Sequence, residues 1–279
     1  MSLFVLTLVL FSAFMHAGWN LFLKKSQDRL VTMATLHLVS GVIGIAAVPF
    51  LPTPYPESWP YIFASVLLHL GYQLFLVKAY IYGDLGQVYP IARGLSPLLL
   101  VFVSVFWIGE ELSTKMMTAI GLITMGIFSL IFRGKIFFDY SFRAVFYALL
   151  TGSFIAAYTL ADGLGVRLSG NAVSYVLWLM ALECWPLLVI TVFRRKHALL
   201  DSLRQNWEFA VPGGILSVSA YGIVVWAMQH SPIALVSALR ESSVVIAALL
   251  SILILKEETT TKHLIAVMMV AAGVIMTRI

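Results

Sequence analysis

Two stretches decide the fold: YPIARGLSPLLLVFVSVFWIGEELSTK at residues 89–115 and VSALRESSVVIAALLSILILKEETTTK at residues 236–262. They belong to one ungapped internal match, in which residues 78–131 return, shifted by 147 positions, as residues 225–278. Apolar identities alone could arise by chance, but polar and small residues keep the same register. The matched residues are Arg93 with Arg240, Glu110-Glu111 with Glu257-Glu258, Thr114-Lys115 with Thr261-Lys262, and Gly126 with Gly273.

The composition predicts a protein that lives in a lipid bilayer. The chain has 279 residues, of which 61% are hydrophobic and 11% charged, and its mean hydropathy is +0.95. A soluble domain of this length needs more polar surface. The formal net charge of +5 could suggest nucleic acid as a partner. We expect none, because the basic residues stand in short loops between apolar runs.

Ten apolar runs can be drawn along the chain, each close to the length of about 20 residues that crosses a hydrocarbon core of about 30 Å. The runs are too long and too uniformly apolar for barrel strands, so each is expected to be a helix. We therefore predict an all-α integral membrane protein with ten transmembrane helices. The predicted spans are 3–23, 30–51, 60–82, 85–107, 114–132, 142–165, 172–193, 208–229, 233–255 and 262–278.

The register of the match predicts an inverted repeat. A shift that carries the fourth span onto the ninth moves the pattern by five spans, an odd number, so the second half must cross the membrane upside down. We predict two five-helix halves, residues 1–137 and 138–279. Internal duplication of this kind in a membrane protein is typical of transporters.

The loop charges predict the orientation. By the positive-inside rule, the side richer in lysine and arginine faces the cytoplasm, which places both termini outside. One side carries Lys24, Lys25, Arg29, Arg133, Lys135, Arg143, Arg194, Arg195, Lys196, Arg204, Lys256 and Lys262, whereas the other carries only Lys115, Arg167 and Arg278.

Arg93 and Arg240 are the main candidates for binding substrate. Each lies roughly eight residues into its span, about 12 Å from the end of the helix, and the inversion brings them to the midplane from opposite faces. A charged side chain at that depth normally faces a wet cavity or a partner. The alternative is a buried ion pair with Glu183 or Glu241.

Two carboxylates are candidates for coupling transport to protons. Glu183 lies near the middle of the seventh span, where a desolvated carboxylate is a candidate proton carrier; its alternative is the ion pair just named. Glu241 follows Arg240 but points about 100° further around the helix. We therefore expect only one of these two neighbours to face the cavity.

Polar and aromatic residues on several spans are further candidates for substrate binding. Those in the third span share one helix face, and Tyr158 aligns with Trp19 under a separate shift of 139. For Trp19 the alternative is the aromatic belt at the membrane interface. His37 is expected to be a hydrogen-bonded packing residue. The candidates are His16, Trp19, Asn20, Tyr72, Gln73, Tyr89 and Tyr158.

The fourth span carries Pro90 and Pro97 on either side of Arg93. Proline frees a backbone carbonyl, and broken helices at the midplane are where transporters bind substrate; the alternative is a simple packing kink. The pairs Glu110-Glu111 and Glu257-Glu258 are interpreted as N-caps or first-turn carboxylates of the fifth and tenth spans. The single cysteine, Cys184, can form no intrachain disulfide, and no metal-binding spacing is present, so we expect no metal and no cofactor.

These features resemble the drug/metabolite transporter superfamily, and within it the EamA-type ten-helix members. The resembling residues are Trp19-Asn20, the tight corners at Gly83-Asp84 and Ser231-Pro232, and the two motif copies at 108–113 and 255–259, the second with Lys256 where the pattern has glycine. The resemblance implies a central cavity lined by the first, third, fourth, sixth, eighth and ninth spans. It also implies transport of small metabolites, and relatives differ in the side on which their termini lie.

The leading hypothesis is a secondary transporter in the plasma membrane, the inner membrane of a bacterium, that works by alternating access. Two arginines favour a carboxylate, phosphate or phosphonate group on the substrate, and a zwitterion fits if Glu183 or an aromatic ring faces its cation. Two alternatives are an intramembrane lipid-processing enzyme, for which no nucleophile and base can be recognised, and a non-transporting scaffold. Protons as coupling ion and a homodimer both stay open.

Overall fold

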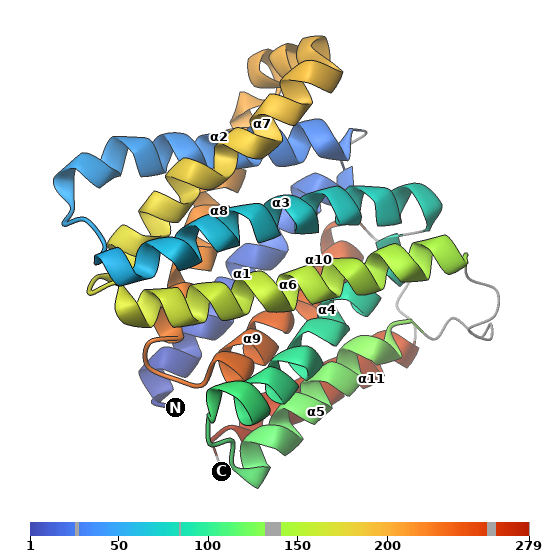
Figure 1. The fold of residues 1–279 in the computed structure, drawn as a ribbon. Helices are drawn as coiled ribbons and strands as arrows, with labels where there is room; N and C mark the ends of the chain where they lie inside the picture. The colour runs from blue at the N-terminus through green and yellow to red at the C-terminus, as the bar shows by residue number, and fades with distance from the viewer. Residues whose placement is uncertain (26–27, 84, 132–140, 256–260, 279) are drawn as a thin grey trace.

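The computed structural model describes residues 1–25, 28–83, 85–131, 141–255 and 261–278, and the described chain is built from helices (Figure 1). The short elements are the 3-10 turns η1 (Val48–Phe50) and η2 (Pro56–Ser58) and the π-helical turn η3 (Ser104–Ile108). The helices are α1 (Leu3–Lys25), α2 (Arg29–Ala47), α3 (Trp59–Tyr82), α4 (Leu85–Val103), α5 (Thr114–Ser129), α6 (Phe142–Leu168), α7 (Ala172–Gln205), α8 (Trp207–Ala227), α9 (Ile233–Glu241), α10 (Ser243–Leu255) and α11 (Thr261–Met276).

The predicted all-helical membrane fold is confirmed. In the described residues eight helical stretches are long and apolar enough to cross a membrane, with α9 and the start of α10 counted as one stretch, and two shorter apolar helices cover 114–129 and 263–276. Together they make ten crossings. Helices satisfy every backbone hydrogen bond within one segment, which apolar surroundings require.

Local sequence signals explain where several helices begin and end. The side chains of Asp28, Ser113 and Asn171 each accept a hydrogen bond from a backbone N–H in the first turn of α2, α5 and α7, as N-caps do. Gly109 ends η3 with φ +73°, and Gly170 follows α6 with φ +72°. Only glycine takes this left-handed conformation without a steric cost.

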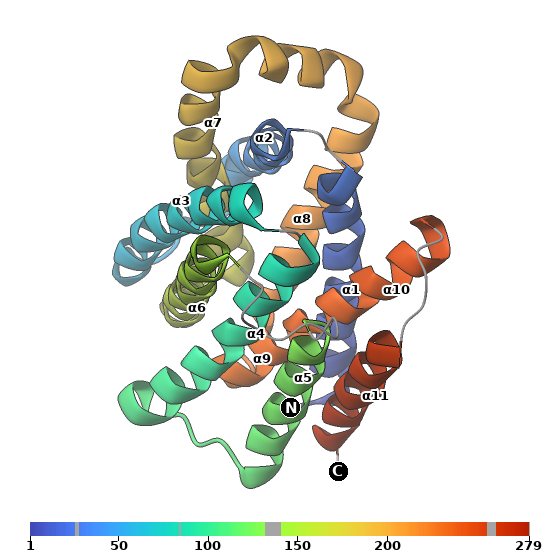
Figure 2. The ribbon, with the colours of Figure 1, turned by 90° about the vertical axis from the view of Figure 1, so that its right-hand side faces the viewer.

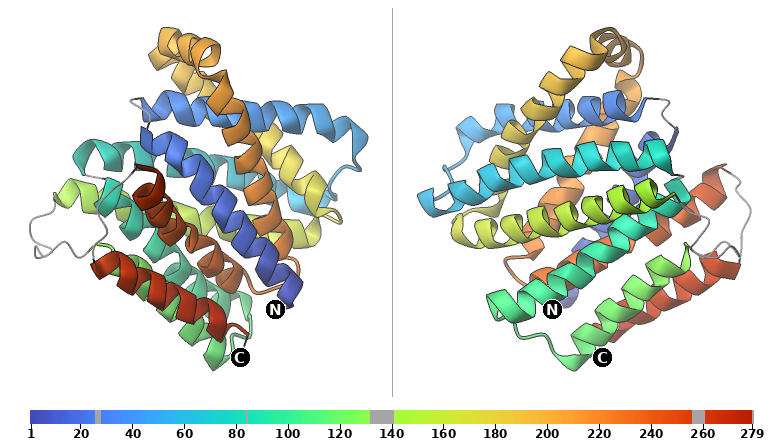
Figure 3. Two further views of the ribbon diagram at one scale, coloured as in Figure 1. Left: turned by 180° about the vertical axis from the view of Figure 1, so that it is seen from behind. Right: turned by 45° about the vertical axis from the view of Figure 1, so that its right-hand side comes forward.

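The helices pair across the two halves in the pattern of an inverted repeat. α3 packs beside α6, and α1 packs beside α8, so the third helix of each half meets the first helix of the other. α2 lies against α7, α5 against α11, and α4 against α9, which pairs equivalent helices (Figure 3). The two halves therefore interlock along their whole length.

The α5–α11 contact shows the repeat at atomic detail. Gly126 and Gly273, which the shift of 147 relates, lie against opposite helices. A Cβ atom on Gly126 would stand 3.1 Å from the carbonyl oxygen of Ala266, and one on Gly273 would stand 2.8 Å from that of Ala119. Ala119 and Ala266 are themselves related by the same shift. Small residues at these positions let the two backbones approach closely.

Both termini lie at one end of the molecule, where α8 turns into α9 (Figure 1), and Arg278 Nη1 lies 3.5 Å from the carbonyl oxygen of Met1. α7 bends at Arg195, whose φ of −143° is not helical. Figure 2 shows its second part crossing over to α8 at the opposite end. The predicted boundary between residues 137 and 138 lies outside the described residues and stays a prediction.

One detail of the predicted fold is wrong. α4 runs as a continuous helix through Pro90 and Pro97, whereas the ninth span, which has no proline, divides at Ser242 into α9 and α10. The Ser242 hydroxyl donates to the carbonyl oxygen of Leu239 at 2.7 Å, and its N–H bonds to the same carbonyl, three residues back. A serine that competes for a backbone carbonyl in this way disturbs the helical ladder.

Candidate functional site

The two repeat-related arginines meet at one carboxylate. Arg93 of α4 places Nε 3.1 Å from Glu241 Oε2, and its Nη1 donates to Oε1 at 3.3 Å. Arg240 donates to Oε1 from Nη2 at 2.8 Å and from Nε at 3.1 Å. All three side chains are buried, with Arg93 3% and Arg240 1% exposed. Two guanidiniums and one carboxylate leave this cluster with a net charge of +1.

The expectation that only one of Arg240 and Glu241 faces inward is wrong. Both residues are buried and both side chains turn into the same cluster. Neighbouring side chains in a helix do point about 100° apart, but every residue of α9 is buried, so both directions lead into the interior. The Ser243 hydroxyl lies 3.5 Å from Arg93 Nη2, next to the same guanidinium.

Tyrosines surround the two cations. Arg93 Nη2 donates to the Tyr89 hydroxyl at 3.2 Å, and the Arg93 guanidinium lies 5.3 Å from the centre of the same ring. Arg240 stands 5.9 Å from the centre of the Tyr158 ring, which Tyr72 meets edge-on at 5.6 Å. Such distances allow cation–π attraction. The structure thus brings these three predicted tyrosines to the arginine cluster.

The predicted residues of α1 lie behind this cluster. His16 is close enough to Arg93 and Arg240 to feel both charges, and its ring meets Trp19 edge-on at 4.9 Å. Trp19 is 8% exposed, which places it in the interior and not in an interfacial belt. Its indole N–H has no hydrogen-bond partner among the described residues. Asn20 donates to the backbone carbonyl of His16 at 2.6 Å.

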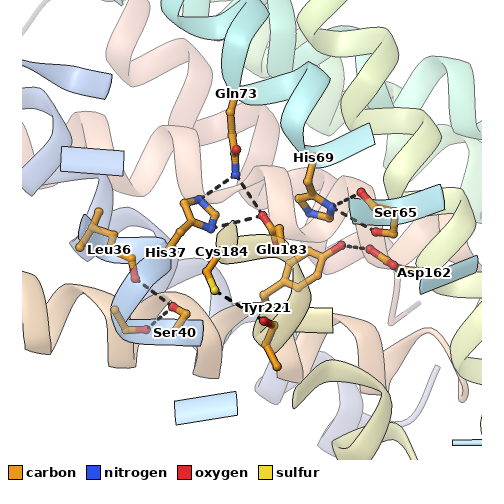
Figure 4. Close-up of polar contacts among 12 residues, drawn as sticks. Leu36, His37, Ser40, Ser65, His69, Gln73, Asp162, Glu183, Cys184 and Tyr221 are labelled. Carbon is orange, nitrogen blue, oxygen red and sulfur yellow. Dashed lines mark hydrogen bonds and ion pairs between the residues drawn. The ribbon is translucent and has the colours of Figure 1, made fainter. Parts of the chain in front are cut away.

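Glu183 belongs to a second cluster, with His37 of α2 and Gln73 of α3 (Figure 4). Glu183 Oε1 accepts a hydrogen bond from Gln73 Nε2 at 3.0 Å and lies 3.2 Å from His37 Nδ1. His37 Nε2 stands 3.1 Å from the same Gln73 amide nitrogen. Since that nitrogen can only donate, His37 Nε2 accepts, and its Nδ1 carries the hydrogen that points at Glu183. The predicted ion pair of Glu183 with an arginine is wrong, and Gln73 lies in this cluster instead of against the arginines.

Sequence reasoning missed one buried carboxylate, Asp162 of α6, which is 0% exposed. Tyr175 donates to its Oδ1 at 3.0 Å, and Tyr221 donates to its Oδ2. Asp162 lies near the predicted end of the sixth span, where acidic residues are common. The available signal was its spacing from Tyr158, since residues i and i+4 share one face of a helix.

At the end of the molecule that holds the termini, Glu110 and Arg167 link three segments. These are the connection between η3 and α5, the end of α6 and the connection between α8 and α9. Arg167 Nη2 lies 2.6 Å from Glu110 Oε1, and Arg167 Nε donates to the carbonyl oxygen of Met228 at 2.9 Å. Glu110 Oε2 accepts from the backbone N–H of Ile233 at 3.1 Å. The interpretation of Glu110 as a cap of α5 is therefore wrong: Ser113 caps α5, and Glu110 serves the first turn of α9. Glu257-Glu258 lies outside the described residues.

Among the described residues, no three His, Cys, Asp or Glu side chains are grouped as a metal ion would require. The polar interior consists of arginines, carboxylates, tyrosines and histidines on interlocking helices. In a comparison with known families, the model of the EamA-like transporter family matches residues 3–132 and 142–279. The chain belongs to the EamA-like transporter family. It is thus a membrane transporter of the drug/metabolite superfamily, as the sequence motifs indicated.

The comparison with solved structures supports the fold of this EamA-like chain. A crystal structure described only as that of a protein superimposes with a TM-score of 0.75 at 17% sequence identity, and the match covers 98% of this chain and 95% of the other. At this identity the likeness concerns the fold alone. No curated protein matches the chain significantly.

Proposed function

We propose that this EamA-like protein is a secondary transporter for a small anionic or zwitterionic metabolite, which it moves across the plasma membrane by alternating access with protons as the coupling ion. Amino-acid-like compounds, organic acids and compounds with a phosphate or phosphonate group fit this description. The observation that carries the proposal is the shared carboxylate: Arg93 and Arg240, one from each half, both bind Glu241.

The charge balance favours an anion. Two buried guanidiniums face one carboxylate, so the cluster lacks one negative charge, and a buried charge without a partner is costly. A carboxylate or phosphate of the substrate would supply that charge, and the planar guanidinium fork binds such groups through two hydrogen bonds. Glu241 then acts as the internal competitor that the substrate displaces from one arginine.

The surroundings also suit a zwitterion. The rings of Tyr89 and Tyr158 already lie beside guanidiniums and could equally hold an ammonium group. The buried indole N–H of Trp19, which lacks a partner among the described residues, offers a hydrogen bond to a polar group of the substrate. A zwitterion could thus be held at both ends.

Arg93 comes from one half and Arg240 from the other, and in transporters with inverted repeats one repeat rocks against the other around a site at their interface. Glu183 and Glu241 are the proposed coupling carboxylates. The plasma membrane as location, the external termini and the absence of catalysis remain predictions, and the question of a homodimer stays open.

The proposal is tested with purified Arg93→Ala and Arg240→Ala. Each variant keeps one arginine for Glu241, so both are expected to remain folded. L-amino acids, citrate, inorganic phosphate and methylphosphonate are screened by thermal shift for stabilisation of the wild type, and the compounds that stabilise it are tested for uptake into proteoliposomes. We expect the alanine variants to lose binding and uptake, and Arg→Lys to restore little because the fork geometry is lost. Normal uptake by both alanine variants would show that the arginines do not bind substrate.

A further inference from the structure

Asp162 is a buried carboxylate that is held by hydroxyl groups. It is 0% exposed, and its neighbours are the phenols of Tyr175 and Tyr221 and the hydroxyl of Ser65. None of the ion pairs in the described part of the chain includes it. A buried carboxylate that serves only stability normally has a cation as partner.

Hydroxyl partners suit a carboxylate that changes its protonation state. A phenol can donate its hydrogen to an ionised carboxylate, and the same oxygen can accept a hydrogen bond from the protonated acid. Both states of Asp162 are therefore satisfied with the side chains in place, and the change needs only the rotation of a hydroxyl hydrogen. An arginine or lysine partner cannot accept a hydrogen bond and would hold the group in one state.

A chain of contacts leads from Asp162 to the arginine cluster. The ring of Tyr221 meets His69 edge-on at 5.5 Å, and His69 stacks on Tyr158 at 3.8 Å. Tyr158 in turn lies against Arg240. Figure 4 shows Tyr221, His69 and Asp162 in one group, with Ser65 bonded to His69.

The elements that pack against α6 are α3, α4, α7, α8, α9 and the turn η2. α4 carries Arg93, which Glu241 holds, and the carboxylate of η2 next to α6, Glu57, is exposed. The remaining titratable and charged groups that influence Asp162 or its hydroxyl partners are Tyr61 and His69 from α3, Tyr158 from α6 itself, Tyr175 and Glu183 from α7, Tyr221 from α8 and Arg240 from α9.

The position of Asp162 suits access from the end that carries the termini. It precedes Arg167 by five residues on α6, which is about 7 Å along the helix. Arg167 is partly exposed at that end, with 31% of its side chain accessible. Asp162 therefore lies below the Glu110–Arg167 ion pair, between that end and the interior.

We propose that Asp162 is a proton-binding site of this transporter. A change in the protonation state of Asp162 is transmitted to Arg240 through Tyr221, His69 and Tyr158. A proton from water binds Oδ2 of Asp162, the Tyr221 oxygen accepts the new hydrogen bond, and the phenolic hydrogen turns away from the carboxylate. Release of the proton to water reverses these steps. The inference rests on the proposed proton coupling, to which it adds a second site besides Glu183.

Infrared difference spectroscopy of the full-length protein in lipid nanodiscs tests the site without any substrate. Acidification should produce a carbonyl band of a protonated carboxyl group that shifts with aspartate labelled with carbon-13 in the side-chain carboxyl. A band from the proposed coupling carboxylate Glu183 is told apart because it shifts with labelled glutamate instead. The aspartate band should be absent from Asp162→Asn. It should persist in Asp201→Asn, which removes an exposed carboxylate of α7. Labelling of the wild-type chain assigns the band to an aspartate, and the contrast between Asp162→Asn and Asp201→Asn assigns it to Asp162.

Labelled arginine reports on the second step. Acidification should change the guanidinium bands of the wild type, and Tyr221→Phe, which keeps the ring against His69 but removes the hydroxyl, should lose this change while keeping the carboxyl band. A carboxyl band that does not move with labelled aspartate overturns the site. A guanidinium change that persists in Tyr221→Phe on acidification overturns the relay. If both signals behave as expected but uptake ignores the proton gradient, the proposed coupling fails and the proton site stands.

Discussion

At the scale of single residues, the structure separates two carboxylates that the sequence treats alike. Glu183→Gln keeps the shape of the side chain, and its new carbonyl oxygen can still accept from His37 and Gln73. We expect this variant to fold with a melting temperature close to that of the wild type. In proteoliposomes it should lose accumulation driven by a proton gradient but retain downhill exchange. Accumulation at the wild-type level would remove Glu183 from the coupling mechanism.

Glu241→Gln is the matched contrast for that experiment. It leaves two buried guanidiniums without a carboxylate, and breaking a buried pair of this kind costs about 3–5 kcal/mol. The melting temperature of Glu241→Gln should therefore fall well below that of Glu183→Gln. Equal stability of the two variants would contradict the assignment of both arginines to Glu241.

The same residues show what the sequence could predict about the site. Depth along a span follows from counting residues, so burial of Arg93, Arg240 and Glu183 was predictable. The interaction partners of these residues depend on how each helix is rotated against its neighbours. The sequence of a single span does not contain that information. Every residue of α9 is buried, so Arg240 and Glu241 both lie in the interior, and the location of Asp162 near a span end hid its burial.

At the scale of helices, the α5–α11 contact gives a sharp packing test. A Cβ on Gly273 would stand 2.7 Å from Ile123 Cγ1 and 2.8 Å from the backbone carbonyl of Ala119. The carbonyl cannot move aside as a side chain can, and overpacking typically costs about 1–3 kcal/mol. Gly273→Ala should therefore lower the melting temperature in detergent.

Gly121, on the same helix α5, is the control for this substitution, because a Cβ there would meet nothing within 4 Å. Alanine in place of glycine inside an exposed helix gains about 1 kcal/mol from helix propensity, so Gly121→Ala should be neutral or stabilising. A loss of stability at Gly121 equal to that at Gly273 would mean that packing between α5 and α11 is not the cause.

Element boundaries show a similar division between what was and was not predictable. The apolar runs predicted the helices, and the register of the repeat predicted that the second half is inverted, because span length and register are local properties of the chain. The role of Glu110 was not predictable in this way. Its carboxylate serves α9 and Arg167, which are distant in sequence, and only the packing of the two halves brings them together.

At the scale of the whole molecule, the orientation in the membrane decides on which side of the membrane the Glu110–Arg167 ion pair lies. The loop charges predict that both termini are outside, and the structure places them at the same end as this pair. A C-terminal fusion to alkaline phosphatase, expressed in a bacterium, should then be active. A C-terminal fusion to green fluorescent protein should be dark, because the fluorescent protein would be exported in an unfolded state. A fluorescent fusion would instead put the ion pair on the cytoplasmic face. Asp162 would then draw its proton from the cytoplasm, so this one measurement also fixes the direction in which the proposed proton must travel.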